Sequence, residues 1–390
     1  MSEQRLKDLL EELVADVPGP DGHSVDHAWQ AARRRNRRSH VLVAAGVAAV
    51  MVAGTAVVAE SLTDGGEPAP APSPASPSGP ERQSPSSRPA APDTTYGGVP
   101  VWWAPPAEDE AGLAWLDSAL PRTVDLSPGR PPVEPGSPVL GVFPVHDLEA
   151  SEPGRFVVLT PDGDTRELDA DHVEANRDEN GNAAALTPFN GGLSPDGWHL
   201  FIAQQSSIKL YAFASGTWTT IDTPDWLAEG ARWLDAATIW VPHALGGGIG
   251  STYGVDGDLL ASDVRHGDPR LSVTAGDEPY GIWVDSGKPI AGSYFLHGPV
   301  DGGPYSNPEG IVARVGGKSF VLALGVDGRG KGCCPVVGWL GEDVVAFRSQ
   351  EGVLAWQVGT GTLFRVSELT GLEPGKEAAG ASWAWQALLR

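Results

Sequence analysis

Cysteine is scarce in this chain of 390 residues, which contains only two, Cys333 and Cys334, side by side. Two adjacent cysteines cannot join distant parts of a fold, and they match no zinc-ligand spacing. A disulfide framework and a structural zinc site are therefore excluded. Residues 329–335 resemble a turn, in which the pair either forms a vicinal disulfide that stiffens the loop or remains as two small, partly buried thiols.

Basic residues are also in short supply, with 27 Lys and Arg against 50 Asp and Glu and a net charge of −23. The first forty residues carry seven basic and seven acidic side chains, so the whole net negative charge lies on the rest of the chain. A surface that acidic repels nucleic acid and anionic lipid. We therefore expect no nucleic-acid partner.

Motifs of common enzyme and cofactor sites are missing from the part of the chain beyond residue 60. It contains no Gly-x-Ser-x-Gly and no phosphate loop, and its histidines show no metal-ligand spacing. Asn176, Asp178 and Asn180 resemble the front of a calcium loop, but Thr187 stands where a bidentate Glu is expected. The sequence thus predicts no catalytic residue, no cofactor and no metal ion.

One stretch is long and apolar enough to cross a membrane, residues 41–59, which are uncharged. As a helix this stretch would rise roughly 28 Å, close to the hydrocarbon thickness of about 30 Å. Five arginines precede it and acidic residues follow it, which places the N-terminus in the cytoplasm. The alternative is a signal peptide cleaved near Ala59, but the long patterned tail favours an uncleaved signal-anchor. We expect a single-pass plasma-membrane protein that contacts lipid through residues 41–59, with its C-terminal domain extracytoplasmic.

The cytoplasmic tail carries an apolar stripe at helical spacing. The stripe consists of Leu6, Leu9, Leu10, Leu13, Val14 and Val17. This spacing predicts a helix of about three turns that ends before Pro18. A short tail cannot bury such a stripe alone. The stripe either packs on a second short helix or the inner membrane face, or it is a docking face for a cytoplasmic protein.

Composition divides the chain into four segments. Residues 1–40 form the helical tail, 41–60 the transmembrane helix, 61–95 a disordered Pro-rich linker and 96–390 the outer domain. Nine prolines lie within residues 64–93, a composition that cannot build a core. In polyproline form the linker could reach on the order of 90 Å and hold the outer domain clear of the bilayer.

The outer domain contains internal repeats. One unit aligns with another without a gap over about 25 residues. The offset of 39 residues between Asp196 and Asp235 matches the period of roughly 36–48 residues that a four-stranded propeller blade needs. The aligned pairs are Asp196 with Gly341, Leu200 with Val345, Tyr211 with Trp356, Gly216 with Gly361, and Trp218 with Leu363. A third unit aligns with the second over its first half only, where Trp233 matches Trp339 and Asp235 matches Gly341. Each unit consists of a turn, a short apolar strand, an aromatic strand ending in Gly, and a further strand.

Two resemblances follow from these patterns. Residues 194–197, Ser-Pro-Asp-Gly, followed by Leu-Phe-Ile at 200–202, resemble the WD40-like β-propeller repeat of bacterial exported proteins. This resemblance implies a membrane-anchored propeller. The layout of helical tail, single span and outer domain resembles that of actinobacterial anti-sigma-type membrane proteins, which implies a sigma-factor-like partner in the cytoplasm.

The sequence therefore predicts an all-β outer domain that is a six- or seven-bladed β-propeller. Blades are expected near 187–222, 228–262 and 336–370, with others near 138–170 and within 270–330. A sheet that joins the two terminal aromatic strands would complete the ring. The alternative, a β-sandwich, is disfavoured by the regular repeats.

For function, these features favour an extracytoplasmic protein that binds an unknown protein or small ligand and signals to a cytoplasmic partner. The alternatives are a lyase or hydrolase acting in the central funnel of the propeller, and a structural or assembly role in the envelope.

Overall fold

Strands dominate the residues that the computed structural model describes. These residues are 91–389 without the internal segments 148–153, 172, 175–190, 205, 224–229, 244–247, 267–270, 286–288, 298–299, 301–307, 326–328, 330–332 and 379. The predicted cytoplasmic tail, the predicted span at 41–59 and almost all of the predicted linker lie outside this part. Within it, no helix is long and apolar enough to cross a membrane. Its helical turns are η1 (Ala107–Gly112) and η3 (Ala387–Leu389).

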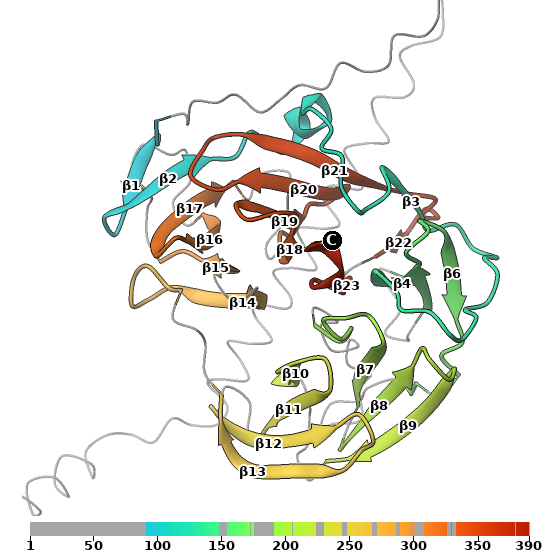
Figure 1. Ribbon diagram of the computed structural model, residues 1–390. Helices are drawn as coiled ribbons and strands as arrows, with labels where there is room; N and C mark the ends of the chain where they lie inside the picture. Colours follow the sequence, from blue (N-terminus) through green and yellow to red (C-terminus); the bar gives the residue numbers. More distant parts are fainter. Residues whose placement is uncertain are drawn as a thin grey trace, which may run out of the picture. The chain divides into compact units, whose positions relative to one another are not determined.

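The described strands form five sheets, numbered here as blades 1–5 in chain order (Figure 1). Blade 1 contains β4 (Gly141–Asp147), β5 (Arg155–Leu159), β6 (Thr165–Leu168), β22 (Lys376–Glu377) and β23 (Ser382–Trp383). Blade 2 contains β7 (His199–Gln204), β8 (Ser207–Ala212) and β9 (Thr217–Asp222). Blade 3 contains β10 (Arg232–Trp233), β11 (Thr238–Pro242), β12 (Ile249–Gly254) and β13 (Leu259–Arg265).

Blades 4 and 5 also include strands from the beginning of the described region. Blade 4 contains β14 (Glu278–Asp285), β15 (Ile290–Phe295), β16 (Glu309–Val315) and β17 (Lys318–Leu324), extended by β2 (Val99–Trp103) and β1 (Thr94–Tyr96). Blade 5 contains β18 (Val336–Trp339), β19 (Val344–Arg348), β20 (Gly352–Gln357) and β21 (Leu363–Thr370), extended by β3 (Thr123–Asp125).

Neighbouring blades pack face to face, which makes the fold an all-β propeller. Separate apolar cores join blades 1 and 2, 2 and 3, 4 and 5, and 5 and 1. Between blades 3 and 4, the Arg232 guanidinium lies 4.9 Å from the ring centroid of Trp240 and 4.7 Å from that of Trp283. Each blade therefore contacts two others, and Figure 1 shows the sheets arranged around a common centre.

The strand register confirms the repeats that the sequence predicted. In blade 2, Leu200 pairs with Tyr211 and Tyr211 pairs with Trp218. In blade 5, the aligned positions pair in the same way, Val345 with Trp356 and Trp356 with Leu363. Corresponding residues thus take corresponding places in the two sheets, because the turn and the alternation of apolar residues repeat together.

The prediction that the two terminal aromatic strands share one sheet is wrong. β2 runs parallel to β17 at the outer edge of blade 4, whereas β23 runs antiparallel to β4 at the inner edge of blade 1. The terminal strands therefore build no additional blade. The described residues form five sheets, of which four have at least four strands, and the predicted total of six or seven blades is not confirmed.

A segment that we name the strap, residues 93–133, runs along the outside of three successive blades. β2 extends blade 4 and β3 extends blade 5, each in parallel with the outermost strand. A further parallel bridge joins Pro132 to Glu167 in β6 of blade 1. The strap covers strand edges that would otherwise present unpaired backbone groups to solvent. Together with β22 and β23, it ties the two ends of the described chain into the ring.

Candidate functional site

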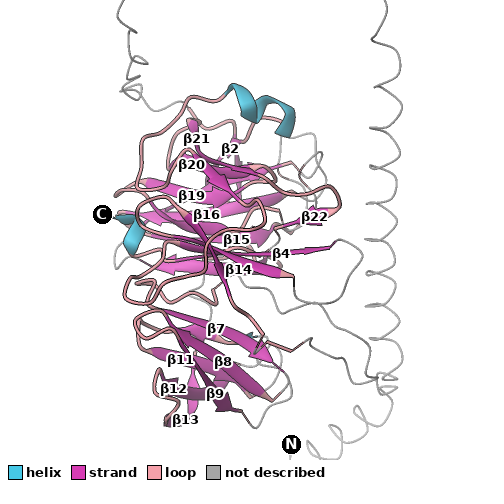
Figure 2. Ribbon diagram, turned by 90° about the vertical axis from the view of Figure 1, so that its right-hand side faces the viewer, coloured by secondary structure: helices cyan, strands magenta, loops and turns pink. Residues whose placement is uncertain are grey.

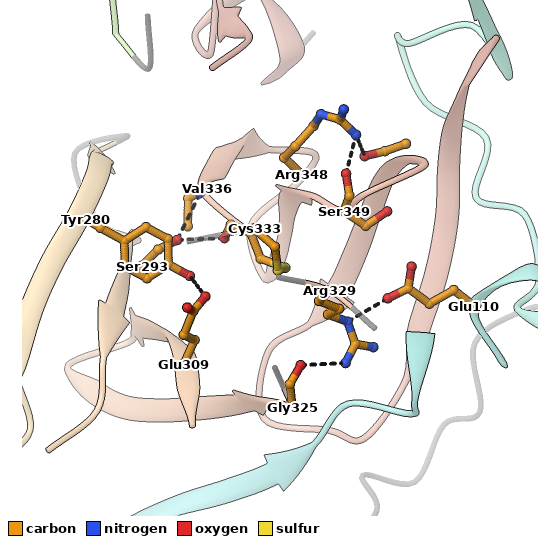
Figure 3. The surroundings of a disulfide bond; sticks show 12 residues. Glu110, Tyr280, Ser293, Glu309, Gly325, Arg329, Cys333, Val336, Arg348 and Ser349 are labelled. Atoms are coloured by element: carbon orange, nitrogen blue, oxygen red, sulfur yellow. Dashed lines mark hydrogen bonds and ion pairs between the residues drawn. A yellow bond between two sulfur atoms is a disulfide. The ribbon is translucent and has the colours of Figure 1, made fainter. Parts of the chain in front are cut away.

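Of the site residues that the sequence singled out, only Cys333 and Cys334 fall in the described part of the chain. The stripe of Leu6, Leu9, Leu10, Leu13, Val14 and Val17 lies outside it, so that docking face stays a prediction. The structure joins the sulfur atoms of Cys333 and Cys334. They lie in the connection between β17 of blade 4 and β18 of blade 5 (Figure 3).

The connection that carries this disulfide is fastened to blade 4. Cys334 is fully buried in the core between blades 4 and 5. The hydroxyl of Ser293 in β15 donates to the carbonyl of Cys334 at 2.9 Å and accepts from the N–H of Val336 at 3.0 Å (Figure 3). One hydroxyl thus satisfies two buried backbone groups, which fixes the loop on the sheet.

Two polar pairs lie at the same connection. The Tyr280 hydroxyl donates to Oε2 of Glu309 at 3.0 Å. Burial, followed by the charge of Glu309, raises the pKa of Tyr280 well above its ordinary value. Arg329 donates from Nε to Oε1 of Glu110 in η1 at 2.8 Å, and both side chains are buried. These contacts hold the loop and the strap in place, and we assign no reaction to them.

No three His, Cys, Asp or Glu residues in the described region gather closely enough to hold a metal ion. The candidate site is instead a cavity of about 310 Å³ where blades 1 and 2 meet. Its lining residues come from the strap, both blades and the C-terminal segment: Ala119, Pro138, Val139, Leu140, Pro161, Asp196, Trp198, Gln386 and Ala387. The lining is mainly apolar with few polar groups, as small-ligand sites are.

The blade 2 side of the cavity is a turn that its hydrogen bonds hold rigidly. Oδ1 of Asp196 accepts from the Ser194 hydroxyl at 2.7 Å and from the Trp198 N–H at 3.1 Å. Gly197 adopts φ +82°, and a Cβ there would lie 2.1 Å from the carbonyl oxygen of Val139. Only glycine allows this approach, so the Pro-Asp-Gly sequence sets the position of the carboxylate against blade 1.

The C-terminal segment forms another wall of the cavity. The backbone N–H of Gln386 donates to the carbonyl of Pro195 at 3.0 Å. On the blade 1 side, the backbone N–H of Val139 donates to the carbonyl of Gly197 at 3.0 Å. Figure 2 shows the ring from the side, with η3 and the chain end on one of its faces. The cavity therefore opens where the strap, two blades and the closing segment of the ring converge.

The sequence marked Asp196 as a repeat position but not as part of a site. Its sequence, Ser-Pro-Asp-Gly, indicates the turn that begins a repeat unit and gives no sign of a binding site. The remaining lining residues are apolar or lie far away in sequence, so no local pattern joined them to Asp196. The signal that could have found the site is the convergence of the strap and the C-terminal segment on blade 1, which depends on tertiary structure.

No family model matches this chain, and no curated protein matches it. Among solved structures, the chain is similar to Hsv2 from Kluyveromyces lactis, with 15% identity over 44% of this chain and 59% of that one and a TM-score of 0.25. It is similar to the β-propeller domain of the Trilobed protease from Pyrococcus furiosus, with 11% identity over 58% of this chain and 69% of that one and a TM-score of 0.24.

The chain is also similar to the WD40 domain of SCAP from fission yeast, with 11% identity over 61% of this chain and 54% of that one and a TM-score of 0.22. The matched part spans less than two thirds of the length of Hsv2 and of the SCAP domain. Because all three TM-scores are below 0.5, these likenesses add nothing to the fold assignment. The five sheets and their packing define the propeller fold.

Proposed function

We propose that this protein is a membrane-anchored extracytoplasmic binding protein, in which the propeller engages a protein or small ligand and the tail engages a cytoplasmic partner. The observation that carries the binding role is the cavity between blades 1 and 2, which has a rigid turn, a carboxylate and a mainly apolar lining. The apolar run at 41–59 and the arginines before it support the anchor and its orientation.

The membrane topology is tested on intact cells that express the full chain with one epitope at each end. We expect the protein in the membrane fraction, with the C-terminal epitope removed by added protease and the N-terminal epitope protected. Replacement of Val50 by Arg within the span should release the protein from the membrane, since a charge there costs several kcal/mol. Recovery of the full-length wild-type chain in the soluble fraction would reject the anchor.

The cytoplasmic role is tested by co-purification of the full chain with an RNA polymerase sigma factor of the same cell. We expect capture by the wild-type chain and at least tenfold weaker capture by Leu10→Asp, because an acid on the apolar stripe disrupts its packing. Glu11→Gln, off the stripe, is the matched control and should capture normally. Absence of capture by the wild-type chain would reject signalling through a sigma factor.

We also propose that Cys333 and Cys334 are oxidised to a disulfide in the extracytoplasmic domain. Alkylation of the unfolded protein without reductant, followed by mass spectrometry, should leave both residues unmodified. After reduction, two alkyl groups should appear. Alkylation of both cysteines without a reductant would show that they are free thiols.

A further inference from the structure

The polar groups of the cavity indicate the chemistry of its ligand. Asp196 contributes a carboxylate, Trp198 an indole ring and Gln386 an amide, while the other six lining residues have apolar side chains. A carboxylate can only accept hydrogen bonds and carries a negative charge at neutral pH. An aromatic ring also attracts a cation. These groups favour a ligand with a positive charge on an apolar body.

The charge of Asp196 has no ion-pair partner within the described part of the chain. His199 is close enough to feel this charge, but burial lowers the pKa of His199 more than Asp196 raises it. His199 is therefore uncharged at neutral pH and does not neutralise the carboxylate. The excess negative charge of the protein further favours cationic ligands.

The equivalent turns of the other blades differ from the Asp196 turn in their relation to the cavity. The equivalent Asp235 in blade 3 makes the same kind of turn, with Oδ1 accepting from the N–H of Ala237 at 2.8 Å. Blade 5 has Gly341 at this position. The repeat therefore uses an aspartate as a turn residue without requiring its charge. Among these three positions, only Asp196 lines the cavity.

The size of the cavity limits the ligand. A water molecule occupies about 30 Å³ in the liquid, so a cavity of about 310 Å³ has room for on the order of ten non-hydrogen atoms. That volume is near the lower end for small-ligand pockets. It suits a small organic cation or the side chain of one lysine.

We propose that this cavity binds the ammonium group of a small organic cation with an apolar body, seated against Asp196 and Trp198. The proposal rests on the binding function proposed above and specifies its ligand. The cation is either a free organic ammonium ion or a lysine side chain of a partner protein, since both present a positively charged nitrogen on an apolar body. Hydrogen bonds from the Ser194 hydroxyl and the Trp198 N–H hold the carboxylate in position before the ligand arrives.

The test uses the full-length protein in detergent, with titration calorimetry for affinity and saturation-transfer NMR for contact. Choline represents a free organic ammonium ion, and its uncharged isostere 3,3-dimethylbutan-1-ol measures the contribution of charge. The peptide acetyl-Gly-Lys-Gly-amide represents a protein lysine. We expect choline or the peptide to bind at least tenfold more tightly than the uncharged alcohol. Binding by choline alone identifies a free organic ammonium ion, and binding by the peptide alone identifies a lysine.

The informative variant is Asp196→Asn, which keeps an Oδ1 acceptor for the turn and removes the charge. We expect it to weaken cation binding at least tenfold while it unfolds at the same denaturant concentration as wild type. Asp235→Asn, in the equivalent turn of blade 3, is the matched control and should leave binding unchanged. Equal losses in the two variants would mean general attraction by an acidic surface and would overturn the proposal.

Failure of all cations to bind would also overturn the proposed ligand class. The membrane-topology and sigma-factor experiments do not involve the cavity. They therefore test the membrane anchor and the cytoplasmic partner independently of the proposed ligand. Binding of the uncharged alcohol as tightly as choline would assign the cavity to apolar ligands instead.

Discussion

At the scale of single residues, Asp277 shows how one buried carboxylate joins the strap to blade 4. Its Oδ1 accepts from the Tyr96 hydroxyl in β1 at 2.5 Å and from the N–H of His297 at 3.0 Å. Its Oδ2 accepts from the N–H groups of Val273 and Thr274, each at 2.8 Å. Burial alone would raise the pKa of Asp277, but these hydrogen bonds to the charged form outweigh burial and lower it.

We predict that Asp277→Asn lowers the free energy of unfolding by at least about 2 kcal/mol at pH 7. Asparagine has a single acceptor oxygen, so its NH2 group must face hydrogen-bond donors that the carboxylate accepted from. A lowered pKa in the folded state means that this stabilisation is present above the unfolded pKa of about 3.9 and is lost as the pH falls through the folded value. Urea unfolding at pH 7 and pH 3 checks this.

The stability difference between wild type and Asp277→Asn should shrink at pH 3. A difference that stays constant between the two pH values would show that the charge of Asp277 does not contribute. Asp235→Asn serves as the control, because the Asp235 turn is exposed and its charge pairs with nothing in the described region.

At the scale of elements, the strap is held by ionic contacts as well as by strand pairing. Arg329 and Glu110 have side chains that are 1% and 11% exposed, so their ion pair is buried. The strap also contains a similar pair that is open to solvent, Arg122 with Asp117 at 3.0 Å, with exposures of 50% and 69%. Buried and exposed pairs of similar length differ greatly in the effect of removing one partner.

Glu110→Gln should therefore destabilise the protein by about 3–5 kcal/mol, because it leaves the Arg329 charge buried and unpaired. Asp117→Asn should change stability by less than about 1 kcal/mol. Both values come from chemical denaturation of the two variants beside wild type. Similar small effects at both sites would mean that the strap contributes little to the stability of the ring.

At the scale of the whole molecule, the ring is closed twice between blades 5 and 1. On the inside, β22 and β23 from the C-terminal segment pair with β4, and on the outside the strap runs from β21 to β6. Trp383 in β23 is buried and packs edge-on against Phe143 in β4, with ring centroids 5.1 Å apart. Closure therefore depends on an aromatic contact between residues far apart in the sequence.

Trp383→Ala should destabilise the ring by about 3–5 kcal/mol, as large cavities in a core do. Since every blade packs on two neighbours, we expect one cooperative transition at a lower denaturant midpoint, followed by tryptophan fluorescence and circular dichroism. Leu260→Ala on the exposed strand β13 is the control and should shift the midpoint little. Separate transitions by the two methods would indicate that the blades unfold independently.

Much of the fold was predictable from the sequence because its signals are local. The Asp-Gly and Thr-Gly turns, the alternation of apolar residues and the ungapped match between the two repeats determined the strands of blades 2 and 5 and their register. These features depend on neighbours within a few residues or on a fixed spacing between repeats. The same local composition led to the predictions of a membrane span, a linker and a tail stripe.

Tertiary structure alone decided how the ring closes and where the cavity lies. Val99–Trp103 and Ser382–Trp383 both read as aromatic strands, but their pairing partners lie more than 200 residues away, and no local pattern selects between the edges of β17 and β4. The cavity arises from the same closure, because the strap and the chain end meet the Asp196 turn only after the sheets have packed. A sequence specifies which segments form strands, whereas the choice among exposed edges is settled by which packing buries the most apolar surface.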